Sequence, residues 1–207
     1  MATTEATRDS KGRFKSKPRT NGADHGSRGN LGMIAGAAAG GAALGLLAMF
    51  GRKAIVQAPS ALAHDWVEAL TLEHAAVAKL FDAIEATDEN ATTRRNLLLM
   101  QLKHALTKHA IEEENVIYPA LREAGQREAA DALNKEHGYV KQYLYELENM
   151  PTASPQWIAT VRRFRADIEE HVAEEETNLF PMLRAMLSEE KNKALALAMN
   201  KEGFKVA

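Results

Sequence analysis

From residue 59 onward, apolar side chains recur at alternating steps of three and four residues, which places them on one face of an α-helix. Four such segments follow one another, over residues 63–84, 99–120, 130–147 and 157–182. Short polar or helix-breaking stretches separate them, and short connections make neighbouring helices antiparallel. The pattern predicts an all-α, up-down four-helix bundle over 59–187. A further amphipathic helix is expected within 188–207, from Ser188 to about Lys201, with Gly203 after it.

The first 58 residues lack this pattern. Residues 1–30 are rich in Lys, Arg, Gly, Ser and Thr, which predicts a disordered basic tail. Residues 31–50 form an uncharged run long enough to cross a bilayer as a helix. Its glycines recur at four-residue steps, which lets a second helix approach and favours self-association. We therefore expect 31–58 to contain a candidate membrane helix and a linker, on an undetermined side of the membrane. The alternatives are a flexible linker or a soluble helix, in a cytoplasmic protein.

Charge and composition narrow the classes of function. The net charge is −2, but the first 58 residues are positive, so the bundle itself is strongly acidic. An acidic bundle argues against nucleic-acid binding. The chain contains no cysteine, which excludes disulfides, thiolate nucleophiles, Cys-ligated zinc and iron–sulfur clusters.

Six ionisable residues interrupt the apolar faces of the predicted helices. They are His74, His109, Glu113, His137, His171 and Glu175. Burying one such side chain without a partner costs on the order of several kcal/mol or forces it neutral. In an antiparallel hairpin, residues equidistant from the turn lie side by side. The midpoints between successive members of this set on neighbouring helices fall on the predicted breaks. We therefore expect all six side chains to converge at one level of the bundle core.

The bundle also contains an internal repeat. Glu73-His74 matches Glu136-His137, and residues 109–121 match residues 171–183. Each half supplies one His and then a His-x-x-x-Glu pair, whose members lie one turn apart on the same helix face. A proline follows ten residues after the second His of each half. Pro119 and Pro181 are expected to kink or end their helices.

This set of side chains predicts a dinuclear metal site. Four imidazoles and two carboxylates exceed the three or four ligands of a tetrahedral zinc site. They suit two octahedral ions bridged by the carboxylates, and imidazole with carboxylate favours iron over manganese or zinc. The alternative is a polar core without metal. The Glu-x-x-His pattern of ferritin-like diiron proteins is absent.

The motifs resemble those of the hemerythrin-like, HHE cation-binding family over the whole bundle. They read Glu73-His74, His109 to Glu113, Glu136-His137, His171 to Glu175, and Phe180-Pro181. The resemblance implies a non-haem diiron centre that binds or senses dioxygen, nitric oxide or a related small oxidant. A diiron enzyme that turns over peroxide or nitric oxide, and an iron-responsive structural or storage module, are the alternatives. The resemblance favours a binding protein over an enzyme.

The chain departs from oxygen-carrying hemerythrins at two positions. A fifth His is replaced by Lys141, which leaves one iron more open and favours sensing or turnover over reversible carriage. The usual Asp five residues after the last His is replaced by Glu176, so either Glu175 or Glu176 is the ligand, with Glu175 preferred.

For most of the other polar residues, the sequence does not decide between a role at the site and a place elsewhere in the bundle. Four tyrosines either bond the ligands or pack against the helices: Tyr118, Tyr139, Tyr143 and Tyr145. Three glutamates either face solvent or orient the ligands: Glu112, Glu114 and Glu174. Three histidines off the apolar faces are expected at the surface: His25, His64 and His104.

Overall fold

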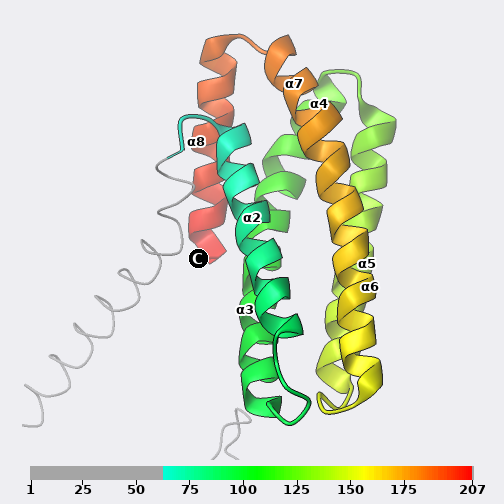
Figure 1. The fold of residues 1–207 in the computed structure, drawn as a ribbon. Coiled ribbons are helices and arrows are strands. Elements are labelled where there is room, and N and C mark those ends of the chain that lie inside the picture. The colour runs from blue at the N-terminus through cyan, green and yellow to red at the C-terminus, as the bar shows by residue number, and fades with distance from the viewer. Residues whose placement is uncertain (1–62, 207) are drawn as a thin grey trace, which may run out of the picture. The chain divides into compact units, whose positions relative to one another are not determined.

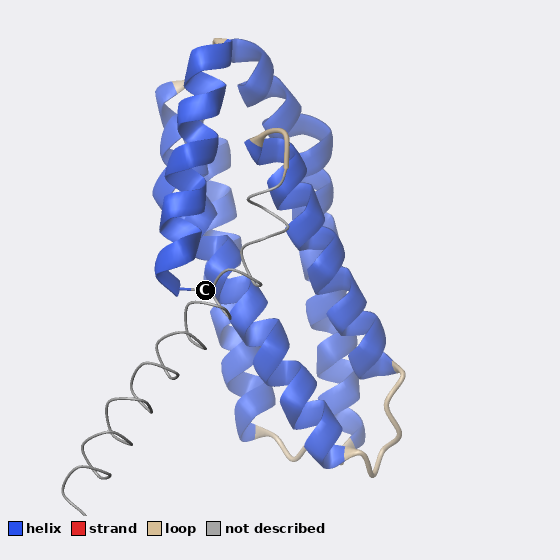
Figure 2. Ribbon diagram, turned by 90° about the vertical axis from the view of Figure 1, so that its left-hand side faces the viewer, coloured by secondary structure: helices blue, strands red, loops and turns tan. Residues whose placement is uncertain are grey.

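The computed structural model describes residues 63–206, and every regular element in that range is helical (Figures 1 and 2). The first bundle helix is α2, Trp66–Glu85. The second begins as α3, Thr92–Glu112, passes through a π-helical turn η1, Glu113–Ile117, and ends as α4, Tyr118–Glu123.

The second half of the bundle repeats this plan. Its first helix is α5, Arg127–Asn149. Its second begins as α6, Pro155–Glu174, passes through a π-helical turn η2, Glu175–Leu179, and ends as α7, Phe180–Met186. The predicted antiparallel four-helix bundle is confirmed.

Local sequence signals account for several helix ends. The Asp65 side chain accepts a hydrogen bond from the Glu68 backbone N–H and caps α2, and Ser154 caps α6 in the same way ahead of Pro155. Gly125 follows α4 with φ of 88°, the left-handed conformation that glycine adopts most readily at a helix C-terminus.

The last helix, α8 (Glu189–Val206), is longer than the sequence predicts. Gly203 was expected to follow this helix, but it lies inside α8 and is buried. The helix packs against α2, α3 and η1, with Met199 fully buried, so tertiary contacts outweigh the weak helix propensity of glycine. The Trp66 indole N–H also donates to the Asn192 side-chain oxygen at 2.9 Å and ties α8 to α2.

The apolar core of the bundle has two parts. The upper core, near the α4 and α7 end, includes Trp66, Leu70, Ile117, Tyr118, Phe180 and Met199. The lower core includes Val77, Phe81, Leu102, Leu147, Trp157 and Phe164. Along each bundle helix, buried histidines or glutamates lie between the residues of the upper core and those of the lower core. A polar layer therefore divides the apolar interior.

The predicted basic tail over 1–30 and the candidate membrane helix over 31–50 lie outside the described residues. Among residues 63–206, no helix is both long enough and apolar enough to cross a membrane.

Candidate metal centre

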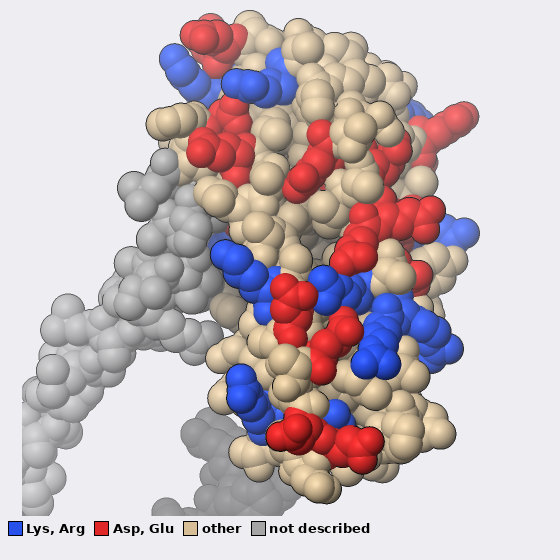
Figure 3. All heavy atoms as spheres, in the orientation of Figure 1, with Lys and Arg blue, Asp and Glu red and all other residues tan. Residues whose placement is uncertain are grey.

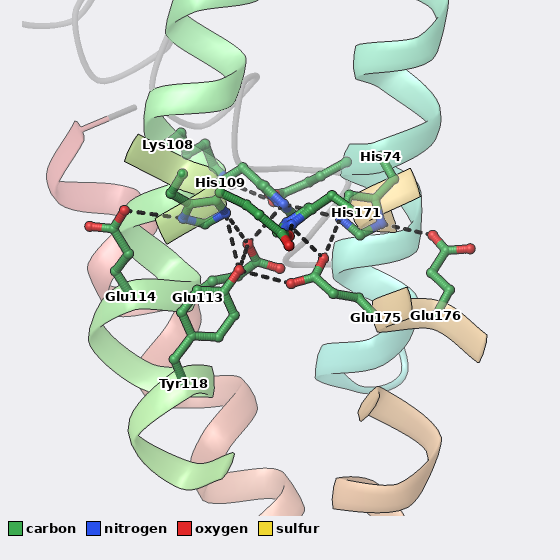
Figure 4. A network of polar contacts seen from close by, with 12 residues as sticks. His74, Lys108, His109, Glu113, Glu114, Tyr118, His171, Glu175 and Glu176 are labelled. Atoms are coloured by element: carbon green, nitrogen blue, oxygen red, sulfur yellow. Dashed lines mark hydrogen bonds and ion pairs between the residues drawn. The ribbon is translucent and has the colours of Figure 1, made fainter. Parts of the chain in front are cut away.

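The structure brings all six residues predicted from the apolar faces into one buried layer (Figure 4). They come from α2, α3, η1, α5, α6 and η2 in turn: His74, His109, Glu113, His137, His171 and Glu175. The two glutamates are completely buried. The convergence follows from the hairpin geometry, because each residue lies at a similar distance from the turn that it shares with its neighbour.

The ligand atoms form two groups that share one carboxylate. The first group contains His74, His109, Glu113 and Glu175, and the second contains Glu113, His137 and His171. Within each group, all ligand atoms lie within 4.8 Å of one another. A shared carboxylate between two sets of imidazoles is the arrangement that a pair of bridged cations requires.

Each carboxylate lies between imidazoles of the two repeats. Glu113 Oε2 is 3.0 Å from His109 Nε2 and 3.3 Å from His137 Nε2. Glu175 Oε2 is 3.4 Å from His171 Nε2 and 3.5 Å from His74 Nε2. Glu113 therefore belongs to both ligand groups, and Glu175 belongs to the first group but lies near one imidazole of each.

A ring of outer glutamates orients the four imidazoles. Each His Nδ1 faces a glutamate oxygen, at 2.8 Å for His74–Glu176, 3.2 Å for His109–Glu73, 3.1 Å for His137–Glu114 and 2.7 Å for His171–Glu136. With its proton on Nδ1, a neutral imidazole presents the lone pair of Nε2 to the interior, as metal-binding histidines do. The sequence contains the signal for this ring, because every one of these glutamates adjoins a His or Glu of the inner set.

Three buried atoms of the inner set have no hydrogen-bond partner among the described residues: Glu113 Oε1, His171 Nε2 and Glu175 Oε2. An unsatisfied buried carboxylate oxygen is costly unless a cation or a proton is present. Nitrogen and oxygen donors in this number match first-row transition metals. The residues present therefore fit a pair of such cations.

The pKa shifts of the residues in this layer indicate that its buried carboxylates require positive charge nearby. Burial raises the pKa of Glu175 well above its usual range, and the neighbouring negative charge of Glu113 adds to the effect. Burial opposes the charge of His109, but Glu113 and Glu73 together raise its pKa well above the usual value. Burial and the adjacent His109 lower the pKa of His74 to about 4. Without metal, protons on Glu175 and His109 supply the positive charge that this layer needs.

Tyr118 is the functional candidate that the sequence left undecided. Its hydroxyl donates to Glu175 Oε1 at 2.8 Å and lies 3.2 Å from Glu113 Oε2 and 3.1 Å from His137 Nε2. Burial and the two carboxylates raise the pKa of Tyr118 well above its usual value, so the phenol keeps its proton.

The other tyrosines do not reach the inner set. Tyr139 and Tyr145 are exposed, and Tyr143 donates a hydrogen bond to Asp167 Oδ2 at 2.6 Å. Repeat matching places Phe180 at the position of Tyr118 in the second half. A phenol is therefore present on only one side of the internal repeat.

A buried ion pair beside His109 was not expected. Lys108 is only 3% exposed, and its Nζ lies 2.5 Å from Glu73 Oε1 and 2.8 Å from Glu112 Oε1. Glu112 is completely buried, so the expectation that it faces solvent is wrong, and it shares the Lys108 ammonium with Glu73, the glutamate that holds His109. The hydrogen bond from His109, with Lys108 nearby, overcomes the effect of burial and lowers the pKa of Glu73 to about 2.

The π-helical turns place the two inner glutamates. Glu113 and Glu175 each begin such a turn, and the N–H of the residue five positions later bonds back to each glutamate's carbonyl. Pro119 and Pro181 follow within the first turn of α4 and α7, where a missing N–H costs little. The helices therefore widen and continue, and they do not stop at the prolines. Such π-helical turns occur frequently at functional sites.

The remaining candidates lie away from the inner set. Lys141 is 67% exposed and its Nζ is 3.2 Å from Glu114 Oε1, so it supports an outer glutamate. Glu176 lies in the outer ring, and Glu175 takes the inner position. His64 is exposed and His104 is half-buried, and neither joins the cluster, while His25 is outside the described residues.

A small cavity adjoins the four imidazoles. Its volume is about 20 Å³, and apolar side chains including Val77, Leu106 and Ile168 complete its wall. This volume accommodates about one water-sized molecule.

Comparison with known proteins identifies the family. The sequence model of the hemerythrin HHE cation binding domain matches residues 65–183, which is more than half of the chain. An uncharacterized hemerythrin-like protein of Schizosaccharomyces pombe is 33% identical over 95 residues, covering 44% of this chain and 46% of that protein. A DNA nickase of Nostoc is 26% identical over 129 residues, covering 62% of this chain and 36% of that protein. The chain therefore matches less than half the length of either relative.

A solved structure shows the same fold. The crystal structure of a hemerythrin HHE cation binding domain-containing protein from Mycobacterium kansasii superposes with a TM-score of 0.61 and 23% identity. The match covers 70% of this chain and 88% of that structure. The chain belongs to the hemerythrin HHE cation-binding domain family, which confirms the resemblance of its motifs and implies that it binds metal cations.

Proposed function

We propose that this chain holds two iron ions and binds or senses dioxygen, nitric oxide or a related small oxidant. The observation that carries the proposal is the shared Glu113 between two groups of buried imidazoles. The ligands are His74, His109, Glu113 and Glu175 on one side and Glu113, His137 and His171 on the other. Manganese and zinc suit this mixture of imidazole and carboxylate less well than iron in a redox-active centre.

The chain's own residues define how a small oxidant is received. The iron pair would supply electrons to it. A diatomic molecule would lie in the small cavity beside the imidazoles, against the apolar side chains of Val77, Leu106 and Ile168. The Tyr118 hydroxyl, which donates to Glu175, is a neutral donor that lies 3.1 Å from His137 Nε2. Lys141 pairs with Glu114 of the outer ring, so it supplies no inner ligand in place of a fifth imidazole.

A diiron enzyme that consumes peroxide or nitric oxide is the second candidate. The missing fifth imidazole favours it, because an open position on a metal permits turnover. We keep it behind binding because the Tyr118 phenol, the acid held between the two inner carboxylates, has a pKa raised well above its usual value by burial and those carboxylates, which makes it a weak proton donor. The activity named for the Nostoc relative is not transferred, since only 36% of that protein is matched.

Two measurements on the iron-loaded full chain separate these candidates. Anaerobic titration with nitric oxide is expected to give a saturable optical change. Steady-state peroxide consumption above that of free iron would favour the enzyme, and its absence would leave the binding function. An iron-loaded chain that shows neither response contradicts both.

Substitution of the shared ligands tests the centre itself. Glu113→Ala and Glu175→Ala each remove an oxygen that lies between two imidazoles. Both variants are expected to lose metal, with Glu113→Ala losing both ions because it belongs to both groups. Tyr118→Phe is the matched control, since Phe180 occupies the equivalent place, and it is expected to keep both ions. Retention of two ions by Glu113→Ala would contradict the bridging role.

A further inference from the structure

The two halves of the repeat differ beside the metal centre. In the first half, the Lys108 ammonium lies between Glu73 of α2 and Glu112 of α3. The matching residues in the second half are Glu136 of α5 and Glu174 of α6. The position of Lys108 is taken by a third carboxylate, Glu170. The second half therefore keeps both carboxylates of the ion pair and lacks its cation.

A groove opens where the cation is missing. It lies between α5 and α6 and has a volume of about 710 Å³, within the size range of sites for small organic molecules. Its acidic side chains are Glu136, Asp167, Glu170 and Glu174, and none of the described residues that line it is a Lys or Arg. Figure 3 shows acidic side chains gathered over the upper half of α6.

The acidic side chains of the groove lack a strong cationic partner. Glu136 bonds His171 Nδ1 at 2.7 Å yet is 46% exposed, whereas its counterpart Glu73 is 12% exposed beneath Lys108. Glu174 accepts a hydrogen bond from the Asn178 amide, and Glu170 forms no ion pair with any described residue.

The floor of the groove is aromatic. Tyr143 stacks on Phe164 with ring centroids 4.8 Å apart and an interplanar angle of 16°. Tyr139 lines the same groove, and the Lys135 ammonium lies 5.9 Å from the centre of its ring. The ring faces are therefore suited to an apolar body that carries a positive charge.

We propose that the α5–α6 groove binds a small amphipathic amine. The ammonium lies among Glu136, Glu170 and Glu174, as the Lys108 ammonium lies between Glu73 and Glu112. The apolar or aromatic body rests on Tyr143, which itself stacks on the fully buried Phe164. This site adjoins the metal centre through Glu136 and His171, and its occupancy does not require bound iron.

A bound amine would also change the surroundings of one imidazole of the metal centre. The ammonium of Lys108 contacts one oxygen of Glu73, and the other oxygen of Glu73 faces His109 Nδ1. An amine on Glu136 reproduces this arrangement for His171. Bound amine therefore makes the environments of the two imidazoles more alike.

The test uses the metal-free full chain and two probes of matched shape. These are 2-phenylethylammonium and the anion 3-phenylpropanoate, each titrated while ¹H–¹⁵N NMR shifts are recorded. The ammonium is expected to bind saturably, with shifts concentrated on α5 and α6, and the anion is expected not to bind. Absence of saturable ammonium binding, equal binding of both probes, or shifts centred elsewhere would overturn the proposal.

Two charge reversals on adjacent residues sharpen the test. Glu170→Lys places an ammonium where Lys108 has one, so it is expected to fill the groove and abolish probe binding. Glu169→Lys changes the net charge equally, but Glu169 pairs with Arg165 and lines the opposite, α2–α6 side. It is expected to weaken binding less than about threefold, as exposed charges contribute little. Equal loss in both variants would show general charge attraction only and would contradict a defined site. Because no metal is present, this result is independent of the iron proposal.

Discussion

At the scale of single residues, the chemistry of the site comes from paired contacts on each imidazole. An outer glutamate holds Nδ1 and an inner glutamate lies near Nε2, as with Glu73 and Glu113 around His109. The outer contact fixes the orientation of the ring, and the inner contact holds Nε2 at 3.0 Å from the shared carboxylate. The site is therefore organised before a cation binds.

The raised pKa values of Glu175 and His109 predict how metal binding depends on pH. Burial and the charge of Glu113 raise the pKa of Glu175. Glu113 and Glu73 raise the pKa of His109, although burial lowers it. Both groups hold protons that a metal must displace, so apparent affinity is expected to rise with pH. The slope is up to about tenfold per pH unit for each proton released. Titration of Mn²⁺ at pH values from about 5 to 7, with proton release measured in parallel, checks this. An affinity independent of pH would contradict it.

Lys108 predicts a large effect on stability. Lys108→Met leaves Glu73 and Glu112 buried without their cation, which is expected to lower the free energy of unfolding by about 3–5 kcal/mol. The matched control is Lys103→Met, whose partner Glu148 and own side chain are both more than 40% exposed. That variant is expected to lose about 1 kcal/mol or less. Urea unfolding of the metal-free chain measures both, and similar losses would contradict the buried ion pair.

At the scale of elements, helix positions were predictable and their internal irregularities were not. The apolar period over 63–84, 99–120, 130–147 and 157–182 located the four bundle helices, and the structure sets their ends through local caps such as Asp65 and Ser154. The π-helical turns were missed because hydrophobic period does not distinguish a widened turn from a helix end at proline. The extension of α8 through Gly203 was missed because it depends on packing against other helices.

The packing of α8 predicts a contrast between two of its residues. Met199 is fully buried, so Met199→Ala is expected to lower the free energy of unfolding by about 2–4 kcal/mol through lost burial and a cavity. Leu197 is 73% exposed, and Leu197→Ala is expected to change stability by about 0.5 kcal/mol or less. Denaturant unfolding compares the two. Equal effects would mean that α8 does not contribute to the core.

At the scale of the whole molecule, the internal repeat supplies matching ligands from both halves of the bundle, but the residues beside those ligands differ between the halves. Hairpin spacing alone predicted that the six inner residues would meet, because distance from a turn is encoded in residue number. Tyr118 and Lys108 could not be assigned in the same way. Their roles depend on side-chain direction between helices, which spacing does not specify. Both lie in the first half, opposite Phe180 and Glu170 in the second.

The most direct test of the central claim is the iron content of the full chain after iron-replete expression, measured with its optical spectrum. The account predicts about two irons per chain and near-ultraviolet absorption typical of a bridged ferric pair. It also predicts loss of both ions in Glu113→Ala, which removes the carboxylate shared by the two groups. One iron per chain, zinc in its place, or no metal would contradict a dinuclear iron centre.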